Sequence, residues 1–356
     1  MGVKSVEIKN FKSIKDSGRI ELNNINVLIG ANGSGKSNFI GFFELLKNIS
    51  NKQLQEYIAV NGRANGVLHF GKQNSDYLSG AILFDNEYRN EYKFKLIPDN
   101  RDNLIFREEE SNNKTAPFNI INTENETILL KDDKKYSENK FLLEYFNSFR
   151  VYHFNDTSFT SKMKSSCYLR DYPYLYEDGR NLASLLYRFK NKYPENFEVF
   201  EYTIKSVAPF FNKFYLFPDE MKEDIILLRW IEKGIIFPAS SLSDGTLRFI
   251  CLATLLLFPE KPMTIILDEP ELGLHPFAIE KLAAMIRVAS TDSQIIISTQ
   301  SVDLVNQFSV DDIIVVKREN NETQFERQSK KELEIWLEDY SIGEIWRNNI
   351  IGGTPL

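Results

Sequence analysis

The stretch that most restricts the fold of this chain is the glycine-rich run at residues 30–37, Gly-Ala-Asn-Gly-Ser-Gly-Lys-Ser. It fits the template G-x-x-x-x-G-K-[ST], in which glycines let backbone N–H groups face phosphate oxygens and the following helix adds its dipole. The run Ile-Asn-Val-Leu-Ile at residues 25–29 before it predicts a buried strand, and residues 38–49 after it predict a helix. A strand, a phosphate-binding loop and a helix in this order predict an α/β fold that binds a nucleotide.

In this template the lysine reaches the β- and γ-phosphates, and the hydroxyl residue after it binds Mg²⁺. These residues are Lys36 and Ser37, so the pattern predicts ATP and Mg²⁺ as the cofactors. The rest of the loop and the first helical turn are expected to contact the nucleotide as well. The residues concerned are Gly30, Asn32, Gly33, Ser34, Gly35 and Asn38.

A pair of acids follows a second apolar segment far along the chain. Residues 264–267 predict a central strand, and Asp268 stands at its C-terminal end, where a carboxylate can bind the metal. Glu269 would point to the other side of the strand end, toward a water aligned with the γ-phosphate, and is the candidate general base. Two acids could instead close a solvated strand end, but the phosphate-binding loop upstream favours the catalytic interpretation.

Further motifs resemble those of a known group of ATPases. Residues 241–246, Ser-Leu-Ser-Asp-Gly-Thr, resemble the signature motif of ABC-type ATPases, and residues 267–276 resemble the Walker B and D-loop run of the RecF and SMC branch. Residues 8–14 and 295–301 resemble the first strands and the switch segment of that branch. The runs 151–158 and 343–355 are similar to small stand-alone bacterial ATPases related to OLD proteins, of the kind found in anti-phage defence.

The resemblance implies a head-to-head homodimer that encloses two ATP molecules, each held by one subunit's phosphate-binding loop and the other subunit's signature motif. Ser243 and Gly245 would then act in trans, through a hydroxyl and a bare backbone N–H at the start of a helix over residues 246–257. Ser243 could also cap that helix, and the two roles are compatible.

Three positions depart from the pattern of this group. The switch position, usually histidine, is Gln300, whose amide can bind a γ-phosphate but cannot transfer a proton near neutral pH, so slow hydrolysis is expected. The D-loop position that is often aspartate is His275, which could equally be an inert loop residue. Gln73 is the nearest candidate for a Q-loop, although a surface glutamine in a turn is the favoured interpretation.

The long separation between Lys36 and Asp268 predicts an insertion in the ATPase core. We expect a P-loop NTPase of the ABC-ATPase head type, with a mixed central sheet, an antiparallel β lobe from residues 66–130 and an inserted helical subdomain. No heptad pattern persists, which argues against a long coiled coil. The expected parts are an N-terminal ATPase lobe at 1–137, the helical subdomain at 138–235, a C-terminal ATPase lobe at 236–317, and a hairpin with a helical tail at 318–356.

Composition restricts the partners and the location of the protein. The chain has 43 basic and 50 acidic residues, a net charge of −7, which does not favour a dedicated nucleic-acid binder. Contact with nucleic acid through the basic run 162–170 stays open, although such runs are usually solvated loops. No apolar run long enough for a membrane span and no signal peptide are visible, which predicts a cytoplasmic protein. Two distant cysteines and three scattered histidines argue against a disulfide framework or a zinc site.

Three functions fit these patterns. The leading hypothesis is an ATP-hydrolysing ATPase whose dimerisation regulates a separate effector, a nuclease or a toxin, in a DNA-linked or anti-phage defence setting. The second is an ATP-clamped scaffold or sensor with negligible hydrolysis, which Gln300 keeps open. The third, the ATPase subunit of a transporter, is disfavoured by the RecF-like motifs. The tail at 330–349 has helical spacing, and we favour a helix that docks on its own core over one that binds a partner.

Overall fold

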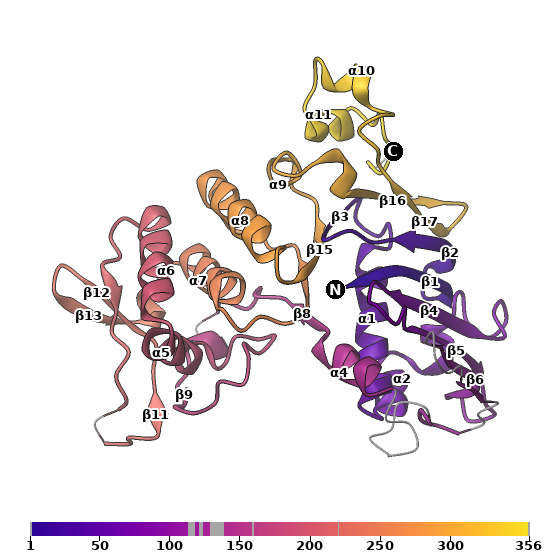
Figure 1. Cartoon of the computed structure of the whole chain (residues 1–356), viewed down its shortest axis with the longest axis horizontal. Coiled ribbons are helices and arrows are strands. Elements are labelled where there is room, and N and C mark those ends of the chain that lie inside the picture. Colours follow the sequence, from indigo (N-terminus) through magenta and orange to yellow (C-terminus); the bar gives the residue numbers. More distant parts are fainter. Residues whose placement is uncertain are drawn as a thin grey trace. The chain divides into compact units, whose positions relative to one another are not determined.

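The protein is described by a computed structural model, in which the chain forms two compact units (Figure 1). The described residues are 2–112, 118–120, 124–128, 139–158, 160–219 and 221–354. Unit 1 consists of residues 1–150, 263–266 and 296–356, and unit 2 consists of residues 151–262 and 267–295. The borders predicted after residues 137, 235 and 317 stay a prediction.

Unit 1 contains an antiparallel sheet with the strand order β2-β1-β4-β5-β6-β7. The strands are β1 (Val3–Phe11), β2 (Ile14–Glu21), β4 (Leu78–Phe84), β5 (Glu91–Pro98), β6 (Leu104–Asn112) and β7 (Phe118–Ile120). Along β5 buried and partly exposed side chains alternate, as expected for a strand with one face on a core. The predicted antiparallel lobe is therefore confirmed.

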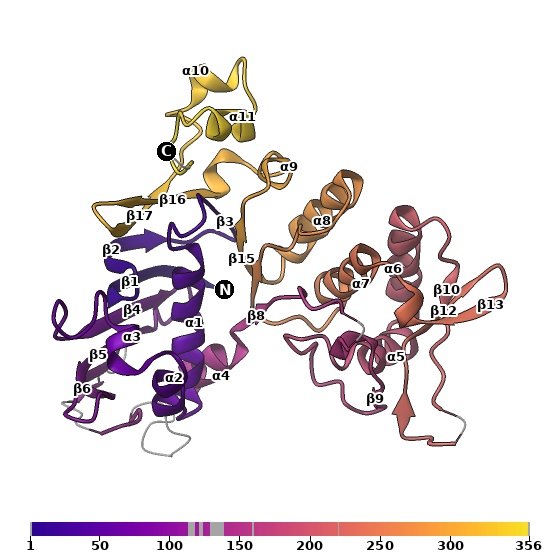
Figure 2. The same ribbon diagram turned by 180° about the vertical axis from the view of Figure 1, so that it is seen from behind.

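Helices cover one face of this sheet (Figure 2). They include α1 (Lys36–Ser50), α2 (Leu54–Val60), α3 (Arg63–Val67) and α4 (Lys140–Ser148). Aromatic rings fill the space beneath α1: Phe42 stacks on Phe94 at 6.2 Å between ring centroids, and Phe43 meets the edge of Phe149 at 5.1 Å. This packing fixes the helix that begins at the phosphate-binding loop.

A second sheet has the order β17-β16-β3-β15-β14-β8. Its strands are β3 (Ile25–Ile29), β8 (Arg150–Tyr152), β14 (Thr264–Asp268), β15 (Gln294–Thr299), β16 (Ile313–Glu319) and β17 (Glu322–Arg327). Strand β16 runs parallel to β3 and antiparallel to β17, so the predicted mixed sheet is confirmed. Strands β3 and β15 are buried along their whole length, which agrees with their predominantly apolar sequences, Ile-Asn-Val-Leu-Ile and Gln-Ile-Ile-Ile-Ser-Thr.

Unit 2 is mainly helical. Its longer helices are α5 (Leu182–Lys192), α6 (Pro194–Val207), α7 (Asp244–Leu257) and α8 (Pro276–Ala289). Its short strands are β9 (Cys167–Tyr168), β10 (Lys213–Phe214), β11 (Ile225–Ile226), β12 (Arg229–Glu232) and β13 (Ile235–Pro238). Helices α5 and α6 confirm the helical spacing predicted for this part of the chain. In the described part of the chain no helix exceeds the 15 residues of α1, and none is long and apolar enough to cross a membrane.

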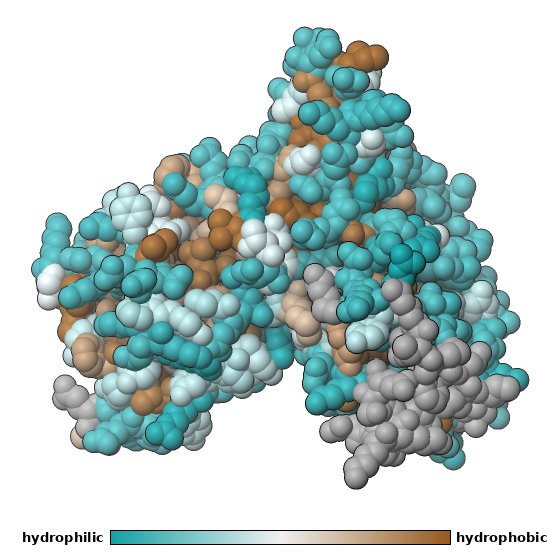
Figure 3. All heavy atoms as spheres, viewed as in Figure 1, coloured by the Kyte–Doolittle hydropathy of each residue, from teal (hydrophilic) through white to brown (hydrophobic). Residues whose placement is uncertain are grey.

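The C-terminal tail forms two short helices, α10 (Glu334–Leu337) and α11 (Ile342–Arg347), instead of one continuous helix. The break arises at Ser341, which begins α11 with a capping box that involves Glu344. Helix α11 is buried against α9 (Val302–Val305), which follows the docking interpretation, whereas α10 leaves Ile335 82% exposed. Apolar surface is visible over α10 and over the β12–β13 hairpin (Figure 3).

Candidate functional site

The glycine-rich loop between β3 and α1 can hold its shape only with glycine at two positions. A Cβ atom on Gly30 would lie 2.1 Å from the Val316 carbonyl oxygen, and one on Gly35 would lie 2.2 Å from Thr323 Oγ1. Gly33 and Gly35 also have φ values of 75° and 114°, which side chains rarely adopt. Glycine at positions 30 and 35 therefore lets the loop pack closely against β16 and β17, and the space beside Gly33 is open.

Lys36 is buried inside this loop, with 5% of its surface exposed. Its Nζ donates to the carbonyl oxygens of Gly30 at 2.7 Å and of Ala31 at 3.0 Å, so these two bonds hold the ammonium within the loop. The buried Ser34 Oγ has no hydrogen-bond partner among the described residues. A buried cation, an unpaired hydroxyl and an open glycine cradle together fit a polyphosphate.

The start of α1 supplies the two remaining residues predicted for nucleotide binding on this loop. Ser37 is exposed in the first turn of α1, where its hydroxyl is accessible to a metal ion. Asn38 donates from Nδ2 to Ser13 Oγ at 2.6 Å, and this bond ties the helix start to the turn after β1. Asn38 thus has a structural contact that the sequence did not reveal.

Gln300 follows β15 directly and shares a pocket with the loop. This pocket has a volume of about 550 Å³ and is lined by Gly30, Ala31, Asn32, Gln300, Val302, Trp346, Arg347 and Thr354. Unit 1 therefore brings the switch residue and the first residues of the loop together. The lining residues from the C-terminal segment were assigned no role from sequence.

The candidate metal ligand Asp268 is the last residue of β14 and is half-buried. His153 Nδ1 lies 3.5 Å from Asp268 Oδ2, and both residues belong to unit 2. His153 lies in the run 151–158, where the sequence alone points to no function for it. A pairing between residues so far apart in the chain leaves no local signal, so only the fold reveals it.

Glu269, the candidate general base, has a strained backbone. Its φ is 47°, in the left-handed region that residues other than glycine seldom occupy. Residues in turns, such as Lys233 and Asn320, share this conformation, so the chain turns sharply where Glu269 follows β14.

Ser243 and Gly245 lie at the N-terminus of α7. The helix begins at Asp244, two residues before the predicted start, and the Thr246 N–H donates to Ser243 Oγ at 3.2 Å. Ser243 is thus an N-cap residue, and its side chain is exposed. The capping interpretation is confirmed, and the hydroxyl is still accessible to another molecule.

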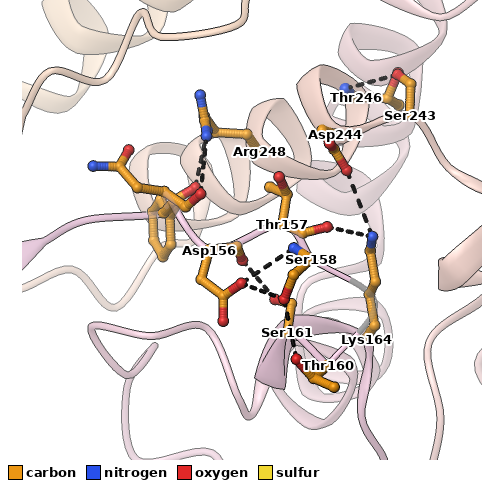
Figure 4. A network of polar contacts seen from close by, with 12 residues as sticks. Asp156, Thr157, Ser158, Thr160, Ser161, Lys164, Ser243, Asp244, Thr246 and Arg248 are labelled. Carbon is orange, nitrogen blue, oxygen red and sulfur yellow. Dashed lines mark hydrogen bonds and ion pairs between the residues drawn. The ribbon is translucent and has the colours of Figure 1, made fainter.

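Arg248, on α7, connects this helix to the segment after β8 (Figure 4) and also to the D-loop. Its Nε donates to the Phe154 carbonyl oxygen at 2.8 Å and its Nη2 to that of Asn155 at 3.3 Å. Its Nη1 donates to the carbonyl oxygen of Leu272 in the D-loop. Burial lowers the pKa of Arg248 from its usual value, but a guanidinium remains charged. Arg248 therefore holds the signature helix, the segment after β8 and the D-loop together.

Lys164 adds a second link between these elements (Figure 4). It donates from Nζ to the Thr157 carbonyl oxygen at 2.6 Å and lies 3.5 Å from Asp244 Oδ1. The neighbouring Lys162 pairs with Asp178 at 3.0 Å. Lys162 and Lys164, the two lysines of the basic run 162–170, thus both contact other residues of unit 2.

Two other candidates from the sequence, His275 and Gln73, lie at a helix start and in a turn. His275 Nδ1 accepts a hydrogen bond from the Phe277 N–H at 3.2 Å and caps α8, with Pro276 in the first turn. Gln73 is exposed in a turn after α3. The interpretation of Gln73 as a surface residue agrees with this position, and His275 has at least a capping role.

Gly245 is expected to be intolerant of a side chain. A Cβ atom there would lie 2.6 Å from the Gly273 carbonyl oxygen, so Gly245→Ala must displace the D-loop backbone. We expect a loss of about 1–3 kcal/mol in the free energy of unfolding, measured by urea denaturation. Gly41→Ala, whose Cβ meets nothing closer than 3.7 Å, is the control. Equal stability of Gly245→Ala and wild type would show that the two loops are not held in this packing.

Comparison with known proteins identifies the family. A family model described as "AAA domain, putative AbiEii toxin, Type IV TA system" matches residues 25–306, which is most of the chain. The chain belongs to this AAA-domain family. The match begins at β3 and extends past β15, so it includes every motif described above from the phosphate-binding loop to the switch segment.

Solved structures show which fold this AAA-domain protein has. An SMC head bound to the C-terminal winged-helix domain of ScpA aligns with a TM-score of 0.62 and 15% identity, over 93% of this chain and 99% of that one. An SMC head with an extended coiled coil, bound to the C-terminal domain of ScpA from Pyrococcus furiosus, aligns with a TM-score of 0.58 and 13% identity, over 95% and 99%. The comparison with curated proteins gave no match. The predicted RecF/SMC-like ABC-type head fold is confirmed.

Proposed function

We propose that this AAA-domain protein binds ATP with Mg²⁺ and hydrolyses it. The observation that carries the proposal is the buried Lys36 ammonium, fixed by two carbonyl oxygens within a glycine loop that has no room for Cβ atoms at Gly30 and Gly35. A family of AAA ATPases and a fold shared with SMC heads support the same conclusion.

The residues divide the chemistry among them. Lys36 would hold the β- and γ-phosphates, and the Ser37 hydroxyl and the Asp268 carboxylate are suitable oxygen ligands for Mg²⁺, which would neutralise phosphate charge. Glu269 would accept the proton of the attacking water. His153, 3.5 Å from Asp268, would orient that carboxylate.

We further propose that the protein works as a homodimer. The exposed Ser243 hydroxyl and the Gly245 N–H at the N-terminus of α7 are suited to a phosphate held by a second copy. A separate effector, a nuclease or a toxin, would read the nucleotide state. The toxin named in the family description and the ScpA domain bound to the SMC heads support action through a partner, whereas the net charge of −7 does not favour nucleic acid.

Gln300 favours a second candidate function, an ATP-clamped scaffold or sensor. Its amide cannot take up or release a proton, so the chain could hold ATP for long periods without cleaving it. Phosphate release during single turnover distinguishes the two candidates. Hydrolysis within the lifetime of the complex supports the ATPase, and ATP retained intact supports the scaffold.

Mixing two inactive variants tests the shared site. Lys36→Ala removes the phosphate contact, and Ser243→Asp keeps an N-cap while placing a negative charge where the phosphate would lie. Each variant alone is expected to lack ATPase activity. In the mixture, mixed dimers contain one site with both motifs intact, so activity should return. A mixture as inactive as its components, although each variant is folded by circular dichroism, would contradict action in trans.

A further inference from the structure

The last described residues of the chain, 346–354, lie against the phosphate-binding loop. Gly353 has a φ of 80°, and a Cβ atom there would be 2.8 Å from Val315 Cγ1 and 3.6 Å from Gly30 Cα. Its backbone is therefore packed on β16 and on the first residue of the loop. All of these residues belong to unit 1. This closing segment, residues 346–354, belongs to the run 343–355 that resembles small stand-alone bacterial ATPases, but none of its residues has been assigned a role so far.

The closing segment lines two pockets at the loop. Trp346, Arg347 and Thr354 line the pocket that also contains Gln300 and the loop residues 30–32. Residues 349 and 352–354 line a second pocket of about 400 Å³, together with loop residues 31–34 and the end of β16. In both pockets the closing segment thus lies beside residues of the loop.

Trp346 carries a buried donor with no acceptor. Its side chain is 6% exposed, and Nε1 has no hydrogen-bond partner among the described residues. Buried polar groups are seldom left unpaired, and an indole N–H can only donate. The missing partner is therefore an acceptor. Arg347 lines the same pocket with a side chain that is always cationic and also only donates. An oxyanion is a suitable acceptor for both the Trp346 N–H and the Arg347 guanidinium.

The position of these two residues is fixed through α9, which begins just after the switch residue. The Gly343 N–H donates to Asn306 Oδ1 at 2.8 Å, and a Cβ atom on Gly343 would lie 2.7 Å from Val302 Cγ1. Because residue 343 has no side chain, its backbone packs directly against α9. This contact places Trp346 and Arg347 in a constant position relative to Gln300.

We propose that Trp346 and Arg347 are nucleotide-binding residues that donate hydrogen bonds to the terminal phosphate of ATP. The assignment rests on the proposed ATP binding and extends its site beyond the family's motifs. The terminal phosphate is chosen because the pocket contains the first loop residues and Gln300, whose amide can bind a γ-phosphate. These residues would then distinguish ATP from ADP.

Calorimetric titration with Mg-ATP and Mg-ADP tests the proposal. Arg347→Ala is expected to weaken ATP binding by about 10- to 100-fold, because hydrogen bonds to charged groups are strong, and to leave ADP binding unchanged. Trp346→Phe keeps the ring but removes the N–H, and about a fivefold loss for ATP is expected. Arg287→Ala, in the last turn of α8, and Trp336→Phe, in the exposed α10, are matched controls.

Fluorescence gives an independent measurement, because the chain has three tryptophans. With Trp230 and Trp336 both replaced by phenylalanine, Trp346 is the only one, and its emission should change saturably with Mg-ATP and less with Mg-ADP. If wild type binds ATP, Lys36→Ala does not, and yet both tail variants bind ATP as wild type does, this inference is wrong and ATP binding stands. Equal losses for ATP and ADP would also overturn it. Absence of ATP binding by wild type would overturn both proposals.

Discussion

Glu269→Gln should keep ATP bound and lower the rate of phosphate release by about 10²- to 10⁴-fold, the range associated with loss of a general base. Glutamine has the same length as glutamate and retains an oxygen that accepts hydrogen bonds, but it cannot take up a proton. Because the substitution changes charge and little else, the left-handed backbone turn at this residue should persist. Phosphate release at saturating Mg-ATP, with calorimetry for binding, measures the two effects separately.

The control for this variant is Glu280→Gln, which changes an exposed glutamate on α8 and should hydrolyse ATP as wild type does. An unchanged rate in Glu269→Gln would remove this residue from the base role. The same variant is suited to light scattering, since ATP that is not hydrolysed should accumulate in the dimer. A doubling of the mass on addition of Mg-ATP would support the shared site, and a constant monomer mass would contradict it.

Lys36→Ala should weaken ATP binding by about 100-fold, and hydrolysis at micromolar ATP should disappear with it. The lysine is the buried cation of the loop, and hydrogen bonds to charged groups contribute about 1.5–3 kcal/mol, with each 1.4 kcal/mol equal to a factor of ten in affinity. The substitution also leaves the carbonyl oxygens of Gly30 and Ala31 without this donor. Calorimetric titration with Mg-ATP provides the measurement.

Lys47→Ala is the matched control, since it removes a lysine from the last turn of the same helix, far along α1 from the loop. Its affinity for ATP should equal that of wild type. If Lys36→Ala bound ATP as tightly as this control, the buried ammonium would have only a structural role. The glycine cradle alone would then have to account for nucleotide binding.

The sequence predicts best where short-range geometry and burial act together. Four of the five residues 25–29 are apolar because β3 is buried on both faces, and the glycine after it is required by a backbone that passes close to β16. The mixed sheet, the antiparallel lobe and helices α5 and α6 follow from periodicity in the same way. In each case the pattern that predicts the element is also the pattern that stabilises it.

What the sequence could not predict depends on contacts between distant residues. The ion pair between His153 and Asp268, and the bonds from Arg248 to the segment after β8, join parts of the chain that share no local pattern. The tail had a helical spacing that concealed the break at Ser341, although serine followed by glutamate three residues later is a recognisable helix start. The role of Trp346 becomes visible only when its burial is known.

The hairpin of β16 and β17 shapes the phosphate-binding loop although it comes almost three hundred residues later. Thr323 donates from Oγ1 to the Ser34 carbonyl oxygen at 2.8 Å, and β3, the strand that leads into the loop, pairs with β16. A growing chain that has emerged only as far as its first lobe therefore lacks the contacts that set this loop. We therefore expect the loop to take its final shape only after the hairpin of β16 and β17 has been synthesised and β16 has paired with β3.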